Sequence, residues 1–91
     1  MGAETQQVTI VNKRGLHARA SAKFVGAVAD MDGCKVTVAK DGNAAAGGSI
    51  LGLMMLGAAK GDTVELSVEG AQAEARLAEL VMLVENGFGE D

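Results

Sequence analysis

The chain has 91 residues, of which 48% are apolar and 2% aromatic, with 13 glycines and no proline. This length fits a single small domain over residues 1–91, and its core must be aliphatic and rich in alanine. The formal net charge is −4 and the chain has no basic run, which argues against nucleic acid as the main partner.

The cysteine content and the apolar segments bear on where the protein works. Cys34 is the single cysteine and cannot form an internal disulfide, so we expect a reducing, cytoplasmic compartment. Residues 1–7 are polar and do not resemble a signal peptide. Since no apolar run is long enough to cross a bilayer, we expect no membrane insertion.

The first third of the chain predicts a strand followed by a helix. Residues 8–11, Val-Thr-Ile-Val, are rich in β-branched side chains and predict a strand. The polar stretch 12–15 ends in glycine and predicts a loop. Residues 18–29 predict an amphipathic helix, which the turn at Asp32-Gly33 closes. The stripe that we expect to be buried comprises Leu16, Ala20, Phe24, Val25 and Val28.

The middle of the chain predicts a hairpin and a short helix. Residues 35–40 alternate in polarity and predict a strand, and Asp41-Gly42 is a strong signal for a tight hairpin turn. A short strand over 43–46 follows and is broken by two glycines. Ser49 is then a suitable N-cap for a helix over residues 50–56.

The last third predicts one more strand and one more helix. Residues 63–69 alternate cleanly, with Val64, Leu66 and Val68 on one face, so the other face of the sheet meets water. After Gly70, an apolar stripe predicts a helix that stops near Gly87. That stripe comprises Ala73, Leu77, Leu80, Val81 and Val84.

The predicted order is β-α-β-β-α-β-α. Because one face of the sheet meets water, the helices must pack on the opposite face. The sequence therefore predicts an α+β fold, an open-faced β-sandwich in which a four-stranded antiparallel sheet carries three helices on one face.

The stretch 15–20 holds the single histidine, His17, between a predicted strand and a predicted helix. The first N–H groups of a helix lack internal partners and, with the helix dipole, form an anion site. Arg19 adds a forked cation suited to phosphate, and Lys23 lies on the same solvent-facing side. A neutral imidazole is a competent nucleophile near neutral pH. This combination indicates a phosphoryl acceptor, although a histidine that only caps the helix fits the same residues.

The predicted helix over 50–56 has no polar side. If Leu53 and Leu56 face the sheet, then Leu51, Met54 and part of Ile50 must meet solvent, which suggests a protein partner. An unusually deeply buried helix is the structural alternative. Ser49 likewise has two interpretations, since it can simply cap the helix or be a site of regulatory phosphorylation.

Three motifs, Gly-Leu-His-Ala-Arg at 15–19, Ser-Ile-Leu-Gly-Leu-Met-Met-Leu-Gly at 49–57 and Ala-Lys-Gly-Asp at 59–62, reveal a resemblance. From residue 8 to about 88, the chain resembles the histidine-containing phosphocarrier (HPr) family of the bacterial phosphotransferase system, including its nitrogen-branch relative NPr. The family fold is the open-faced β-sandwich predicted above.

The resemblance implies roles for particular residues. His17 would accept a phosphoryl group from enzyme I and pass it to an enzyme IIA protein, acting as a stoichiometric intermediate without metal or cofactor. Arg19 would stabilise the phosphoryl oxygens, with backbone donors from Ala18 and Arg19. Ser49 would match the serine modified by HPr kinase/phosphorylase. The partner-binding residues would be Ile50, Leu51, Met54 and Lys23, and the protein would be a monomer.

The chain departs from the family pattern directly after the motif arginine. Ala20 stands where most members have proline, which bears on the rigidity of the site and the transfer rate. The tail over 87–91 is more similar to the nitrogen branch, whereas the stretch 49–57 is more similar to the sugar-transport members. The sequence therefore leaves open whether the relay serves sugar uptake or nitrogen regulation.

A hypothesis from another class is a small regulatory α+β domain that senses a metabolite and transfers no phosphoryl group. Such a domain would need a concave pocket and would not need an exposed His17.

Overall fold

The structure, a computed structural model, describes residues 3–90. Over these residues the chain forms a four-stranded sheet, three α-helices and one 3₁₀ turn. In chain order the elements are β1 (Glu4–Thr9), α1 (Ala18–Ala29), β2 (Cys34–Lys40), β3 (Asn43–Ala46), α2 (Ile50–Met55), β4 (Thr63–Gly70), α3 (Ala73–Glu85) and η1 (Gly87–Gly89).

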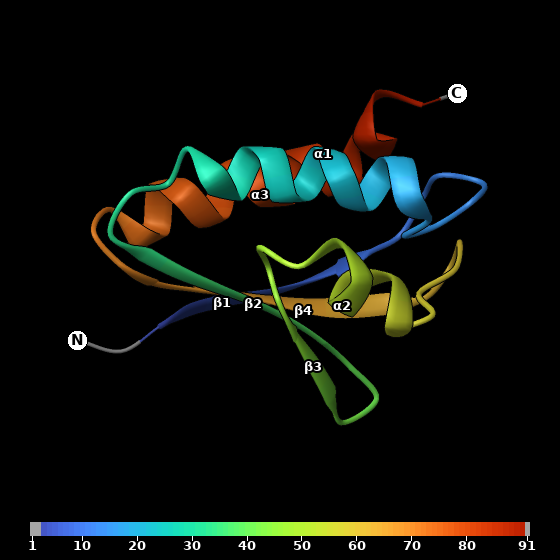
Figure 1. Cartoon of the computed structure of the whole chain (residues 1–91), viewed down its shortest axis with the longest axis horizontal. Helices are drawn as coiled ribbons and strands as arrows, with labels where there is room; N and C mark the ends of the chain where they lie inside the picture. The colour runs from blue at the N-terminus through green and yellow to red at the C-terminus, as the bar shows by residue number, and fades with distance from the viewer. Residues whose placement is uncertain (1–2, 91) are drawn as a thin grey trace.

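The sheet has the strand order β1-β4-β2-β3, and every neighbouring pair is antiparallel. Figure 1 shows α1 and α3 running side by side along one face of the sheet, while α2 packs against α1 and β3. The C-terminal segment turns upward near the start of α1 in this view. The predicted open-faced β-sandwich is therefore confirmed.

The core lies between the sheet and the helices and is almost entirely aliphatic. Val64, Leu66 and Val68 of β4 are all buried, as the alternating pattern predicted. Because the sheet supplies every second residue to one face, a single apolar layer under the helices suffices. The largest fully buried side chains include Phe24, Leu53, Leu66, Leu80 and Phe88.

The β2–β3 hairpin follows the predicted turn chemistry. Asp41 and Gly42 both have positive φ, of 51° and 83°, and the flanking residues Lys40 and Asn43 are paired. Two central residues with positive φ are what a tight turn with the twist of the adjoining strands requires. The short third strand over 43–46 is thereby confirmed.

The predicted first strand, over residues 8–11, was wrong in its bounds. The strand runs over Glu4–Thr9, and its first four residues are exposed. As an edge strand paired only to β4, it is held by backbone hydrogen bonds and tolerates polar side chains, so apolar content was a poor guide. Ile10 lies beyond the strand but is buried, and its N–H donates to the Asp62 carbonyl at 2.8 Å.

The other differences are small. β2 and β4 each extend one residue further than predicted because Cys34 pairs with Gly70. α2 ends at Met55, one residue early, with Leu56 as its C-cap. The bounds of α1 are as predicted. No helix in residues 3–90 is long and apolar enough to cross a membrane.

The orientation of α2 leads to a stability prediction. We expect Leu53→Ala to lower the free energy of unfolding by about 2–5 kcal/mol, because truncating a fully buried side chain leaves a cavity. Leu51→Ala, in the same helix but at a position that is 68% exposed, is the matched control and should change stability by at most about 0.5 kcal/mol. Urea denaturation measures both. Equal losses would contradict this orientation of α2.

Candidate functional site

His17 is the N-cap of α1, with an extended backbone (φ −75°, ψ −178°). Its carbonyl accepts from the Ser21 N–H at 2.9 Å, which closes the first helical turn. The imidazole Nδ1 accepts from the Arg19 N–H at 3.3 Å. An N-cap side chain ordinarily accepts one of the free N–H groups of the first turn. The predicted capping role is therefore present, and it points Nδ1 at the helix N-terminus.

The loop before His17 is fixed by contact with the segment after α2. Gly15 has φ +62°, and a Cβ there would lie 2.2 Å from the Ala58 carbonyl oxygen. The Leu16 N–H donates to that same oxygen at 3.0 Å, and the Leu16 side chain is buried. Both the left-handed backbone and the lack of space require glycine at position 15.

Glu90 and Asn12 complete the surroundings of the imidazole, and the sequence analysis missed both. Glu90 Oε2 lies 2.7 Å from His17 Nε2, and Glu90 Oε1 accepts from Asn12 Nδ2 at 3.0 Å. Asn12 is 3% exposed and also donates to the Gly15 carbonyl at 2.9 Å. The one available signal was Phe88, since an aromatic residue after the last helix indicates that the tail packs on the core.

The residues around the imidazole form a small hollow, which we call the His17 hollow. It has a volume of about 180 Å³. Its lining residues are Lys13, Arg14, His17, Arg19 and Glu90. Three cations facing one imidazole, at a helix N-terminus, attract an anionic group. Arg19 is therefore where the motif predicted it.

Two other predicted residues have a different setting. The N–H of Arg19, expected to bind phosphoryl oxygens, is engaged by His17 Nδ1. Lys23 does not line the His17 hollow; its Nζ donates to the Phe88 carbonyl at 2.7 Å.

Ala18 is the first residue of α1 and Ala20 is fully buried in its first turn. Helix α1 thus begins at Ala18, as predicted, with Ala20 at the position where the resemblance led us to expect proline.

The carboxyl group of Glu90 experiences opposing effects. Its partial burial raises the pKa, but the hydrogen bonds from Asn12 and His17 and the positive charges of His17 and Lys23 outweigh burial. The net effect holds the pKa of Glu90 below its ordinary value of 4.5. The carboxylate is therefore ionised at neutral pH.

The predicted helix 50–56 does expose its apolar side chains. Leu51 is 68% exposed, and Ile50 and Met54 are each 41% exposed. Met55, which the sequence analysis left out, is the most exposed at 77%. Ile50, Leu51, Met54 and Met55 together form what we call the α2 patch. Leu53 alone of the helix is fully buried, so the alternative of a deeply buried helix is wrong.

Ser49 caps α2. Its Oγ accepts from the Gly52 N–H at 3.0 Å, and its side chain is half-buried beside β3. The capping role explains the residue structurally, and the setting leaves its regulatory role as a prediction.

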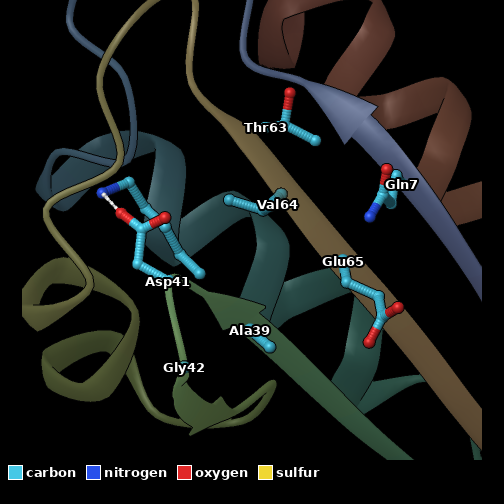
Figure 2. Close-up of a pocket in the computed structure, with 8 residues that line it drawn as sticks. Gln7, Ala39, Asp41, Gly42, Thr63, Val64 and Glu65 are labelled. Atoms are coloured by element: carbon cyan, nitrogen blue, oxygen red, sulfur yellow. Dashed lines mark hydrogen bonds and ion pairs between the residues drawn. The ribbon is translucent and has the colours of Figure 1, made fainter.

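A larger hollow lies on the open face of the sheet, next to the β2–β3 turn (Figure 2). It has a volume of about 460 Å³ and is lined by Gln7, Ala39, Lys40, Asp41, Gly42, Thr63, Val64 and Glu65. The positively charged side chain in this hollow, Lys40, is already paired with carboxylates, since its Nζ lies 3.0 Å from Asp41 and 3.8 Å from Asp62. Within residues 3–90, no group of His, Cys, Asp and Glu side chains could hold a metal ion.

Known proteins match nearly the whole chain. The family model described as "PTS HPr component phosphorylation site" matches residues 4–86. Phosphocarrier protein HPr of Pseudomonas aeruginosa is 47% identical over 85 residues, covering 92% of this chain and 93% of that protein. Phosphocarrier protein NPr of Shewanella violacea is 39% identical over 85 residues, covering 93% and 92%. HPr-C-His from Thermoanaerobacter tengcongensis has a similar crystal structure, with a TM-score of 0.90, 39% identity and coverage of 97% and 98%.

The family model and the relatives define the class of this protein as a phosphocarrier. The chain belongs to the HPr family, whose members act with enzyme I and enzyme IIA proteins in the phosphotransferase system. It is therefore a phosphoryl carrier of that system, and nothing in these comparisons supports a metabolite sensor.

The contacts of Glu90 lead to a titration prediction. Because its folded pKa is depressed, the Glu90 contact contributes stability above pH 4.5 and loses it as the pH falls through the folded pKa. Asn12→Ala removes one hydrogen bond to the carboxylate, so the pKa of Glu90 should rise. A carboxyl ¹³C titration by NMR measures it in both proteins. Identical titration curves would mean that the Asn12 bond does not stabilise the charged form.

Proposed function

We propose that His17 is the residue of this phosphocarrier that accepts the phosphoryl group from enzyme I and passes it to an enzyme IIA protein. The observation that carries the proposal is the geometry of Nδ1, which faces the N-terminus of α1 beside the cations of the His17 hollow. His17 is also the single histidine of the chain, so no other imidazole can take this role.

The chemistry is one displacement that runs in both directions. The Nδ1 lone pair forms a bond to phosphorus as the bond to the donor histidine breaks, and the donor nitrogen keeps the electron pair. The Arg19 N–H, which Nδ1 now holds at 3.3 Å, is then free to donate to a phosphoryl oxygen, together with the Ala18 N–H. The Arg19 guanidinium can grip two of those oxygens as their charge redistributes.

We assign partner binding to Ile50, Leu51 and Met54, extended by Met55. The His17 hollow offers charge but little apolar area, whereas the α2 patch offers apolar area without charge. Burial of apolar surface stabilises a complex by about 25 cal/mol per Å². The α2 patch is therefore the main source of affinity. The ammonium group of Lys23, the other predicted partner-binding residue, donates to the Phe88 carbonyl.

We further propose that Ser49 is phosphorylated by HPr kinase/phosphorylase as a regulatory event. A phosphate at this N-cap adds roughly −1.5 to −2 charge, which a helix N-terminus tolerates. The same charge lies next to Ile50 at the edge of the α2 patch, where it opposes burial against a partner. The effect therefore falls on docking while the fold is preserved.

The remaining expectations from the sequence stay predictions. They are a cytoplasmic location, a monomeric state and action without metal or cofactor. Relatives named HPr and NPr both match, so the matches fit a carrier for sugar transport and a carrier for nitrogen regulation equally.

We expect His17→Ala to abolish labelling by phosphoenolpyruvate and enzyme I. The wild type should carry an acid-labile, base-stable phosphate, as expected for a phosphorylated imidazole nitrogen. The variant should stay folded, because loss of an N-cap contact costs about 1 kcal/mol. Arg76→Ala is the control, since Arg76 pairs with Glu79 on α3 at 3.0 Å and should label normally. Full labelling of the His17 variant would contradict the assignment of His17 as the phosphoryl acceptor.

We expect Met54→Glu to weaken binding to enzyme I by about tenfold or more, because a carboxylate would be buried in an apolar contact. Met82→Glu introduces the same change at another exposed methionine, 69% exposed on α3, and should bind normally. Calorimetric titration gives both affinities.

Ser49→Asp tests the regulatory site in the same titration and should also weaken binding. If the Met54, Met82 and Ser49 variants all bind like the wild type, the α2 patch is not the docking surface.

A further inference from the structure

The carboxylate of Glu90 joins the C-terminal segment to the imidazole. One oxygen lies 2.7 Å from His17 Nε2 and the other accepts from Asn12 Nδ2 at 3.0 Å. Both side chains are mostly covered, with 18% of His17 and 15% of Glu90 exposed. We call this chain of contacts, Asn12 to Glu90 to His17, the tail latch.

The position of Glu90 is built by the packing of the residues before it. Phe88 is 1% exposed and adopts a positive φ of 57°, and its carbonyl accepts from Lys23 Nζ at 2.7 Å. The Glu90 N–H donates to the Gly87 carbonyl at 2.9 Å. Because a buried aromatic ring and two hydrogen bonds hold the segment, the carboxylate is presented to the imidazole by the fold.

The tail latch fixes where the proton of a neutral imidazole resides. An ionised carboxylate can only accept hydrogen bonds, so Nε2 must carry the hydrogen. Nδ1 accepts from the Arg19 N–H, so it must carry the lone pair. The two contacts require the same tautomer, with the hydrogen on Nε2. The nucleophilic lone pair of Nδ1 therefore lies on the side of the ring that faces the His17 hollow. Glu90 thus holds the ring from the opposite nitrogen.

Phosphorylation changes what Glu90 does. When Nδ1 bonds to phosphorus and Nε2 keeps its hydrogen, the ring carries a positive charge. Lys13, Arg14 and Arg19 all oppose that charge, and Lys23 stands near the carboxylate. Among the described residues that line the His17 hollow, Glu90 alone is acidic. It is therefore the counter-charge of the phosphorylated imidazolium.

We propose that Glu90, oriented by Asn12, is a positioning residue for phosphoryl transfer, which holds the Nε2 proton of His17 and balances the ring charge while Nδ1 carries the group. The inference rests on the proposed role of His17. In acceptance the N–P bond forms at Nδ1 and no proton leaves Nε2; in release that bond breaks, the pair returns to Nδ1 and the ring becomes neutral again. The same pattern of a histidine oriented through its second nitrogen occurs in other nucleophilic sites.

Glu90→Gln tests the proposal with little change in shape. A carboxylate accepts from both Asn12 and His17, whereas a carboxamide has one acceptor oxygen and turns a donor toward the other partner. One bond of the tail latch must therefore be lost, together with the charge. Glu85→Gln, the same substitution at an exposed position at the end of α3, is the matched control.

Two readouts separate positioning from docking. We expect Glu90→Gln to slow phosphoryl acceptance from phosphorylated enzyme I by about tenfold, a typical loss when the partner of a functional histidine is removed, with unchanged affinity for unphosphorylated enzyme I. We also expect the Nε2–H proton resonance of the free protein, shifted downfield by the carboxylate, to move upfield. Glu90→Asp, which keeps the charge and both acceptors, should recover part of the rate.

The outcomes are distinguishable. A Glu90→Gln variant that accepts phosphoryl groups at the wild-type rate overturns the proposal, and a faster variant would mean that Glu90 covers the imidazole. An unchanged Nε2–H resonance overturns the tail latch without reference to enzyme I. If the wild type itself is not labelled on His17, the proposed role of His17 fails, and the role of Glu90 fails with it.

Discussion

The position of the imidazole depends on one backbone contact, in which Ala58 O meets the loop at Gly15 and Leu16. The hydrogen bond from Leu16 measures 3.0 Å, and a Cβ at position 15 would lie 2.2 Å from the same oxygen. A side chain at position 15 has no room there, and the Leu16 hydrogen bond holds the residue directly before His17, the N-cap of α1. Because Ala58 follows α2, this contact also fixes the start of α1 relative to the helix that carries the α2 patch.

The sequence predicted correctly those elements whose structure depends on neighbouring residues. The observed bounds of α1 agree with the predicted ones because the apolar spacing and the N-cap that set them lie within the helix and directly before it. The β2–β3 turn agrees because two positive φ angles suit Asp41-Gly42. The bounds of β1 were predicted wrongly because they depend on a distant segment. Pairing with β4 makes Glu4–Thr9 a strand, and an exposed edge strand of this kind needs no apolar pattern in its own sequence.

The site divides in the same way. His17 and Arg19 lie two residues apart and could be recognised as one motif. Glu90 lies 73 residues from His17 and 78 from Asn12 in sequence, and a carboxylate in a tail after the last helix follows no periodicity. Only the three-dimensional path of the chain, with Phe88 buried against the core, brings that carboxylate to the imidazole. The residues that perform a local task were predictable, whereas those that support it from a distance were not.

A carrier differs from an enzyme that binds its product tightly, because its phosphoryl group must leave as readily as it arrives. The charges of Lys13, Arg14 and Arg19 stabilise the phosphorylated state as well as the transition state, so they speed acceptance but do not speed release. Each added cation would therefore make the group easier to accept and harder to pass on. The proposed counter-charge of Glu90 acts in the same direction, since it stabilises the ring charge that the imidazole carries only while it is phosphorylated. By this reasoning, the cations of the His17 hollow and Glu90 together set how strongly the carrier holds its phosphoryl group, and Glu90 does so without touching the phosphoryl oxygens.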